Sequence, residues 1–264
     1  MGHKKAQKAE KQFCAFCAFL WLVALPVLAQ AQESRNLTPT QFAIQQQQQR
    51  LDSSDAEERR DAVMRLGAMR REAASRAVLR ALQDPAAIVR ATAVKAILSL
   101  GSEASAGYLL PLLNDKDEFV RRETAYALGH TKSRTATAAL SERLLNDKED
   151  GVRAAAAVAL GEIGDEAAVV PLVQALTNTK KPNVFVLRAA AVALGKIRSR
   201  AGTAALITTL NNEKLPSDVR REAARSLGLI GDPTAAPALK AASTAEDPFL
   251  AEIAFEALKK LNRG

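Results

Sequence analysis

Few side chains in this 264-residue sequence have the type and spacing that catalysis or metal binding requires. It contains two histidines, His3 and His130, and two cysteines, Cys14 and Cys17. Iron and zinc sites combine several ligands, usually with histidine among them, yet His130 is followed by a threonine. A serine hydrolase would need a base beside its nucleophile. We therefore expect no catalytic residue, metal or cofactor, and interpret the protein as non-enzymatic.

The side chains that could act are basic and apolar ones, at fixed positions of a recurring ten-residue motif. Its third position is often arginine, and its seventh is apolar in the middle of the chain with basic residues on either side. An apolar stripe with basic borders would accept an amphipathic or acidic peptide. Alternatively, the valines fill gaps between helices and the arginines pair with Glu123 and Glu222. The candidate binding residues are Lys95, Arg122, Tyr126, Val158, Arg188, Val192, Arg221 and Arg225.

The motif occurs in seven copies about 32 residues apart, and such a period indicates a repeat architecture. The copies begin at Glu58, Val89, Val120, Val152, Val186, Val219 and Leu250. The ninth position is apolar in every copy, and the tenth is glycine in five copies. We predict that this glycine ends a helix in the left-handed conformation. The five glycines are Gly67, Gly129, Gly161, Gly195 and Gly228.

Each copy predicts two helices, because an apolar segment precedes the motif and the motif itself has apolar residues at helical spacing. Proline in three of the first helices, at Pro111, Pro171 and Pro237, is expected to bend them. The sequence therefore predicts an all-α fold, an α-solenoid of about seven helix-pair repeats over residues 55–264. Stacked repeats form a concave surface, commonly lined by the second helices, that suits an extended partner.

These helix pairs resemble HEAT repeats, which have proline in the first helix and a Val-Arg-x-x-Ala-x-x-Ala-Leu-Gly pattern in the second. The short variety, similar to the repeats of phycobilin lyases, fits best. In such arrays an aspartate followed six residues later by an arginine implies a hydrogen-bonded ladder between repeats. The pattern lapses at Leu187 and Ala251, and Arg220 would need a partner of different geometry, such as Asp218. The three pairs are Asp84 and Arg90, Asp115 and Arg121, and Asp147 and Arg153.

The first 31 residues have the pattern of a secretory signal peptide. Four lysines precede an apolar run from Phe13 to Leu28, which ends in Ala29-Gln30-Ala31. The alternative is a membrane anchor, but the run has sixteen residues where a span needs roughly 20. Cleavage after Ala31 predicts an exported protein, periplasmic or extracellular, without cysteine. We interpret residues 32–54 as a polar tether and a short N-terminal capping helix.

Charge and architecture together favour an exported scaffold that binds a protein or peptide through its concave face. The net charge is +8 and falls to +5 without residues 1–31. A basic binder of polyanions or anionic membrane surfaces is the alternative. Acidic residues interleaved with the basic ones weigh against nucleic acid, and we expect membrane contact only through an uncleaved signal segment. A lyase-like enzyme related to phycobilin lyases is the least favoured hypothesis.

Overall fold

The computed structural model describes residues 37–178 and 183–261. Every regular element in these two ranges is helical, which confirms the predicted all-α class. None of the helices in the described ranges is long and apolar enough to cross a membrane. The predicted signal peptide, residues 1–31, lies outside the described residues. The chain divides into two units between Gln49 and Arg50.

The helix α2 (Pro39–Arg50) belongs almost entirely to the first unit. Its start is a reciprocal capping box. The Gln41 N–H donates to Thr38 Oγ1 at 3.3 Å, while the Thr38 N–H donates to Gln41 Oε1 at 2.9 Å. A helix thus begins at Pro39, directly after the capping-box threonine.

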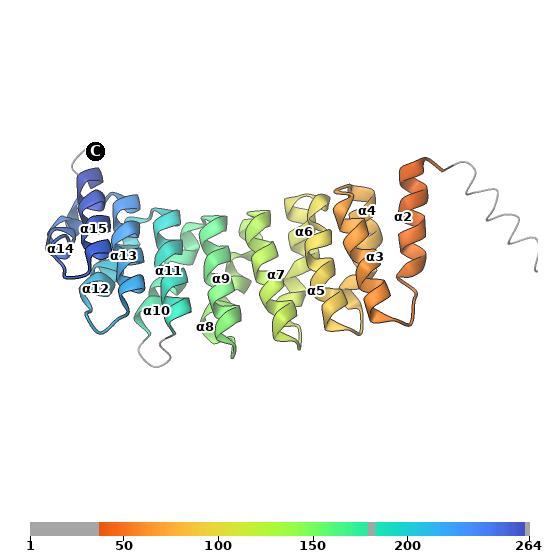
Figure 1. Ribbon diagram of the computed structural model, residues 1–264, viewed down its shortest axis with the longest axis horizontal. Coiled ribbons are helices and arrows are strands. Elements are labelled where there is room, and N and C mark those ends of the chain that lie inside the picture. The colour runs from red at the N-terminus through yellow and green to blue at the C-terminus, as the bar shows by residue number, and fades with distance from the viewer. Residues whose placement is uncertain (1–36, 179–182, 262–264) are drawn as a thin grey trace, which may run out of the picture. The chain divides into compact units, whose positions relative to one another are not determined.

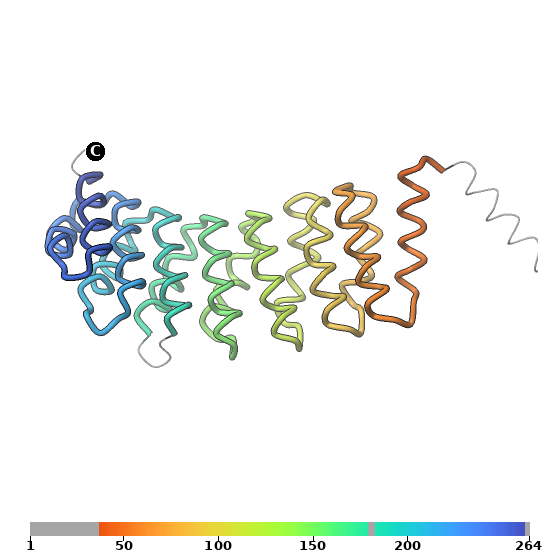
Figure 2. The backbone as a smooth tube through the Cα atoms, in the orientation of Figure 1, coloured from red at the N-terminus to blue at the C-terminus, as the bar shows by residue number. Residues whose placement is uncertain are grey.

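The second unit consists of two layers of helices that alternate along the chain, as Figures 1 and 2 show. Each second helix packs against the next second helix and against a neighbouring first helix. This arrangement confirms the α-solenoid. The second helices are α3 (Ala56–Ala68), α5 (Ala87–Ala96), α7 (Glu118–Thr131), α9 (Asp150–Ile163), α11 (Val184–Ile197), α13 (Ser217–Ile230) and α15 (Pro248–Leu261). The first helices are α4 (Glu72–Val78), α6 (Ser102–Leu109), α8 (Thr137–Asn146), α10 (Val169–Thr177), α12 (Thr203–Asn211) and α14 (Ala236–Ala242).

The first helices are divided into an α-helical and a 3-10 segment. The 3-10 segment follows α4 and α6, as η1 (Leu79–Gln83) and η3 (Leu110–Asn114), and precedes the other four first helices. Pro171 and Pro237 lie in the first turns of α10 and α14, where an N–H has no partner within the helix. Pro111 lies where α6 gives way to η3. All three prolines therefore lie within two residues of a junction between 3-10 and α-helical segments, across which each first helix continues without a gap.

The glycine at the tenth position has a different role from the predicted one. It lies within its helix and faces the next second helix. A methyl group on Gly161 would lie 2.8 Å from Cα of Ala193, closer than real contacts of this kind. The left-handed residue comes three positions later, directly after the helix end in four copies and two residues after it in the copy of α3. These residues are Arg70, Lys132, Gly164, Arg198 and Gly231.

Two copies have no such glycine. Lys259 takes its place in the last second helix, α15, and Leu98 takes it in the copy of α5, whose helix is shorter. The helix α5 ends at Ala96 after ten residues, whereas α7 and α9 have fourteen. A leucine side chain could not be accommodated where even a methyl group would clash with the neighbouring helix. We attribute the early end of α5 to this substitution.

Candidate interaction surface

The eight candidate residues all lie on second helices, from α5 to α13. The third and seventh motif positions are four residues apart, so they lie on the same side of a helix. We call this side of the second helices the second-helix face. Tyr126 is 37% exposed, and Val158 and Val192 are half-buried. The valines therefore partly fill the space between helices and partly contribute apolar surface.

Every basic candidate lies within 4.0 Å of a carboxylate. The predicted alternative of arginine pairing with Glu123 and Glu222 is thus present for Arg122 and Arg225. The face carries charge, but in the form of ion pairs. The N···O distances are Lys95–Glu123 2.6 Å, Arg122–Glu123 4.0 Å, Arg188–Asp218 3.5 Å, Arg221–Asp247 2.8 Å and Arg225–Glu222 3.7 Å.

Arg221 has a structural partner in the next repeat. It donates from Nε and Nη2 to the two carboxylate oxygens of Asp247, at 3.0 and 2.8 Å, and its guanidinium lies 5.0 Å from the centre of the Phe249 ring. These hydrogen bonds lower the pKa of Asp247 to about 2. Its neighbour Arg220 donates from Nε to the carbonyl oxygen of Leu210 at 2.9 Å, and not to Asp218. The arginine that joins α13 to the next repeat is therefore Arg221, at the third motif position, one residue later than the ladder arginines of the earlier copies.

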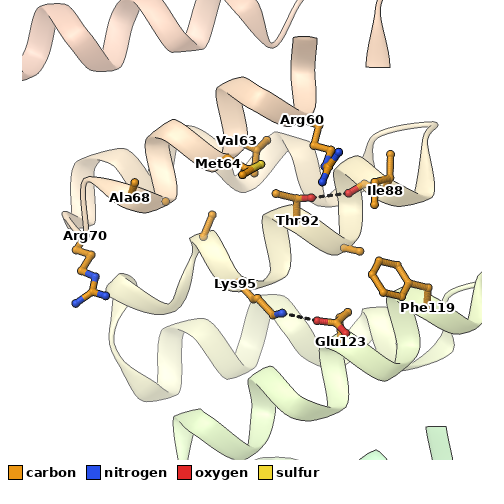
Figure 3. A pocket seen from close by; sticks show the side chains of 13 residues that line it. Arg60, Val63, Met64, Ala68, Arg70, Ile88, Thr92, Lys95, Phe119 and Glu123 are labelled. Carbon is orange, nitrogen blue, oxygen red and sulfur yellow. Dashed lines mark hydrogen bonds and ion pairs between the residues drawn. The ribbon is translucent and has the colours of Figure 1, made fainter. Parts of the chain in front are cut away.

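Two grooves on the second-helix face were not predicted from the sequence. The N-terminal groove has a volume of about 500 Å³ and is lined by α3, α5 and α7, with Met64, Ile88 and Phe119 among its side chains (Figure 3). The C-terminal groove has a similar volume and lies on α13 and α15, with Leu229 and Phe249 among its side chains. The sequence signal for the first was Ala91, a small residue at the third position between two copies that have arginine there.

The predicted ladder is present, with a different geometry from a direct pair six residues apart. Arg121 donates from Nε and Nη2 to both carboxylate oxygens of Asp147, each at 2.9 Å, and these side chains are 6% and 1% exposed. Its Nη1 donates to the backbone carbonyl of Asp115, six residues earlier, at 2.9 Å. Asp84 and Asp115 thus each bind the preceding arginine with the carboxylate and the following arginine with the backbone carbonyl. Two further pairs, Arg59–Asp84 and Arg90–Asp115, have the same form.

The ladder perturbs its carboxyl groups. Burial, the largest single effect, would raise the pKa of Asp147. The hydrogen bonds from Arg121 and from the Glu149 N–H, together with the charges of Arg121 and Arg143, outweigh it, so that the pKa lies below its usual value. The same causes lower the pKa of Asp84 and Asp115. The ladder ends at Arg153, which pairs with Asp150 in its own helix; Asp150 in turn accepts a hydrogen bond from Asn183 at 2.5 Å. The three pairs of the ladder, which involve Arg59, Arg90 and Arg121, join neighbouring repeats and are structural.

Comparison with known families decides what these repeats are. The family model for HEAT repeats matches residues 45–129, 108–185 and 171–259. The chain belongs to the HEAT-repeat family. No curated protein matches the sequence significantly.

Solved structures resemble this HEAT-repeat protein over most of its length. The YibA protein of Escherichia coli is 22% identical, with 85% of this chain and 82% of YibA covered and a TM-score of 0.62. The complex of CpcE and CpcF of phycocyanin lyase from a Nostoc species is 28% identical, with 86% and 92% covered and a TM-score of 0.50. An engineered protein is 23% identical, with 84% and 68% covered and a TM-score of 0.54. The resemblance to repeats of phycobilin lyases thus extends to structure.

Side chains of metal-ligating type are scattered over this HEAT-repeat array. His130 is exposed in the last turn of α7. Within residues 37–178 and 183–261, no group of three or more histidine, cysteine or acidic side chains could hold a metal ion. Among the features that could engage a ligand in this part of the chain are the apolar surface, the grooves and the ion pairs of the second-helix face.

Proposed function

We propose that this HEAT-repeat protein is an exported, non-enzymatic scaffold that binds a protein or peptide through its second-helix face. The observation that carries the proposal is the composition of that face, where apolar residues lie between basic residues that already have carboxylate partners. Helices hold these side chains in place before a partner arrives, so binding costs little ordering entropy. Recognition would rest on shape, apolar contact and exchange of ion pairs.

The ion pairs favour a protein partner over a polyanion. A nucleic acid or an anionic lipid surface would have to compete with Glu123, Asp218, Glu222 and Asp247 for the basic side chains. Polyanion binding also weakens steeply with salt, because it depends on the release of counterions. An apolar contact does not.

Export rests on the sequence of residues 1–31. A basic start, an apolar run that is short for a membrane span and a small-residue exit support cleavage after Ala31. The partner would then be a periplasmic or extracellular protein.

The test is co-purification of the full chain, tagged at its C-terminus and produced in its own source organism. The extracytoplasmic fraction is bound and washed at low and at high salt, and the N-terminal residue of the recovered protein is determined by mass spectrometry. We expect a discrete protein that remains at high salt and an N-terminus at Gln32. Recovery of nucleic acid or lipid at low salt alone would contradict the proposal. A recovered protein that still carries residues 1–31 would contradict export.

Two tyrosines provide matched variants for this test. Tyr126 is exposed on the second-helix face and Tyr108 on α6, in the layer of first helices. Tyr126→Glu should abolish retention of the partner, while Tyr108→Glu should leave it unchanged. The intact mass of the partner before and after incubation tests the alternative of a lyase-like enzyme, suggested by the likeness to the phycocyanin lyase complex. A scaffold leaves that mass unaltered.

A further inference from the structure

The N-terminal groove is a recess in the second-helix face with an apolar lining. Met64 is 52% exposed, and Ile88 and Phe119 contribute further apolar surface (Figure 3). The recess exists because α5 carries Ala91 and Thr92 where α7 carries Arg122 and Glu123. Its volume, about 500 Å³, lies within the range of specific binding pockets.

The rim of this groove is basic. Arg60, Arg70 and Lys95 line it together with a single carboxylate, Glu123, which pairs with Lys95. Cations still outnumber carboxylates by three to two when Glu57 is counted, which pairs with Arg60 from outside the groove. Arg70 is exposed at the end of α3, with no carboxylate within 4.0 Å among the residues that the structure describes.

Arg60 is suited to bind a further acceptor. Its Nη1 donates to Glu57 Oε2 at 3.0 Å, while Nε is buried and has no acceptor in the described part of the chain. The side chain is 38% exposed, and its guanidinium has two terminal nitrogens besides Nε. These carry four N–H groups, of which Glu57 engages one. A carboxylate can accept from the others, and charge-assisted bonds of this kind are strong.

The C-terminal groove provides an internal comparison. It has the same volume and also an apolar lining, but its charged side chains are balanced, with Arg225 and Lys260 against Glu252 and Glu256. Charge complementarity to an acidic partner is therefore a property of the N-terminal groove and not of grooves on this face in general.

We propose that the N-terminal groove binds an acidic segment of a partner protein. Bulky apolar side chains of that segment would pack on Met64, Ile88 and Phe119, and one of its carboxylates would bind Arg60. This proposal rests on the proposed function and names the chemistry of the partner. Apolar contact supplies affinity, and the basic rim selects acidic over basic sequences.

The test uses random twelve-residue peptides displayed on phage and selected on the purified full-chain protein. We expect a consensus with acidic and bulky apolar residues. A synthetic peptide of that consensus should bind at least about tenfold more weakly to Arg60→Met, which loses a charge-assisted hydrogen bond. Met64→Glu should abolish binding. Leu229→Glu, the matched change in the C-terminal groove, should leave binding unchanged, and thermal melts of all three verify folding.

Methionine methyl resonances report the site directly, because the sequence holds only three methionines. The peptide should shift the resonance of Met64, assigned with Met64→Leu, and not that of Met69. Selected peptides that bind normally to Met64→Glu but not to Tyr126→Glu would overturn this proposal and leave the proposed function standing. A basic consensus would also overturn it. Failure to enrich any peptide, together with loss of the partner in the co-purification, would overturn both.

Discussion

The N-terminal and C-terminal halves of the array share two devices that join neighbouring repeats, but they differ in how far the arginine–aspartate pairs extend. Gly67 approaches Ala96 in the N-terminal half, and Arg221 pairs with Asp247 in the C-terminal half. From α3 to α8, three successive bidentate pairs between arginine and aspartate connect the repeats. From α7 to α15, the tenth-position glycines let each second helix approach the next one closely, through Ala159, Ala193, Ser226 and Ala257. Neither device is continuous along the chain.

The two devices replace one another where one is missing. Leu98 removes the glycine contact between α5 and α7, and there the ladder is intact on both sides, at Arg90 and Arg121. Leu187 interrupts the ladder at α11, and there Gly161 and Gly195 pack tightly against their neighbours. A buried ion pair spans a gap through long side chains, whereas glycine requires helices in contact. Each groove lies beside a glycine contact, with Gly67 lining the N-terminal groove and Gly228 the C-terminal groove.

The largest expected effect tests the ladder. Arg121→Ala should lower the free energy of unfolding by about 3–5 kcal/mol, because it leaves Asp147 buried with only the more distant Arg143, at 3.6 Å, as an ion-pair partner. The neighbouring Arg122→Ala should cost less than about 1 kcal/mol, since Arg122 is more exposed and only loosely paired. Denaturant titrations measure both. Equal midpoints would contradict the structural assignment of the ladder.

A smaller effect is expected at the glycine contacts. Gly161→Ala should cost about 1–3 kcal/mol, because the new methyl group would lie 2.8 Å from Cα of Ala193. Gly151, in the same helix, is the control. A methyl group there would meet only Arg122 Cδ at 3.7 Å, so alanine should stabilise by about 0.5–1 kcal/mol. If both changes stabilise, close approach is not the reason for the glycine.

The ladder half should also respond to acid. The pKa values of Asp84, Asp115 and Asp147 are lowered in the folded protein, so their contribution to stability is complete above the unfolded pKa of about 3.9. It is lost as the pH falls through the folded pKa values. Urea titrations between about pH 6 and pH 2 should therefore show a decrease below about pH 4. Asp147→Asn should be less stable at neutral pH and show a shallower decrease; an unchanged slope would exclude the ladder as its source.

The smallest expected effect concerns the left-handed caps in both halves. Lys132 has a φ of 54°, a conformation that Gly164 and Gly231 adopt in later repeats. Lys132→Gly should raise the free energy of unfolding by about 0.5–1 kcal/mol, since glycine adopts this conformation without steric cost. Gly164→Ala should lower it by a similar amount. A loss of stability in Lys132→Gly would show that the lysine side chain contributes contacts that outweigh the steric cost of its left-handed conformation.

Much of the fold could be predicted from the sequence, because each element depends on local patterns. Apolar residues at helical spacing define the helices, and a period of about 32 residues defines the repeats. The capping box at Thr38 specifies where α2 begins. A spacing of four residues within a helix is enough to place Arg122 with Tyr126, and Arg188 with Val192, on one face.

Features that depend on the distance between repeats required the tertiary structure. Glycine suits a left-handed helix end and a close helix contact equally well, and only the position of Ala193 identifies the role of Gly161. The aspartate whose carboxylate binds Arg121 lies 26 residues later in the chain, whereas the aspartate six residues earlier accepts only through its backbone carbonyl. The N-terminal groove likewise depends on how far α5 lies from α3 and α7. The local sequence thus determines which side of a helix a residue occupies, while the packing of one repeat on the next decides which atoms it meets.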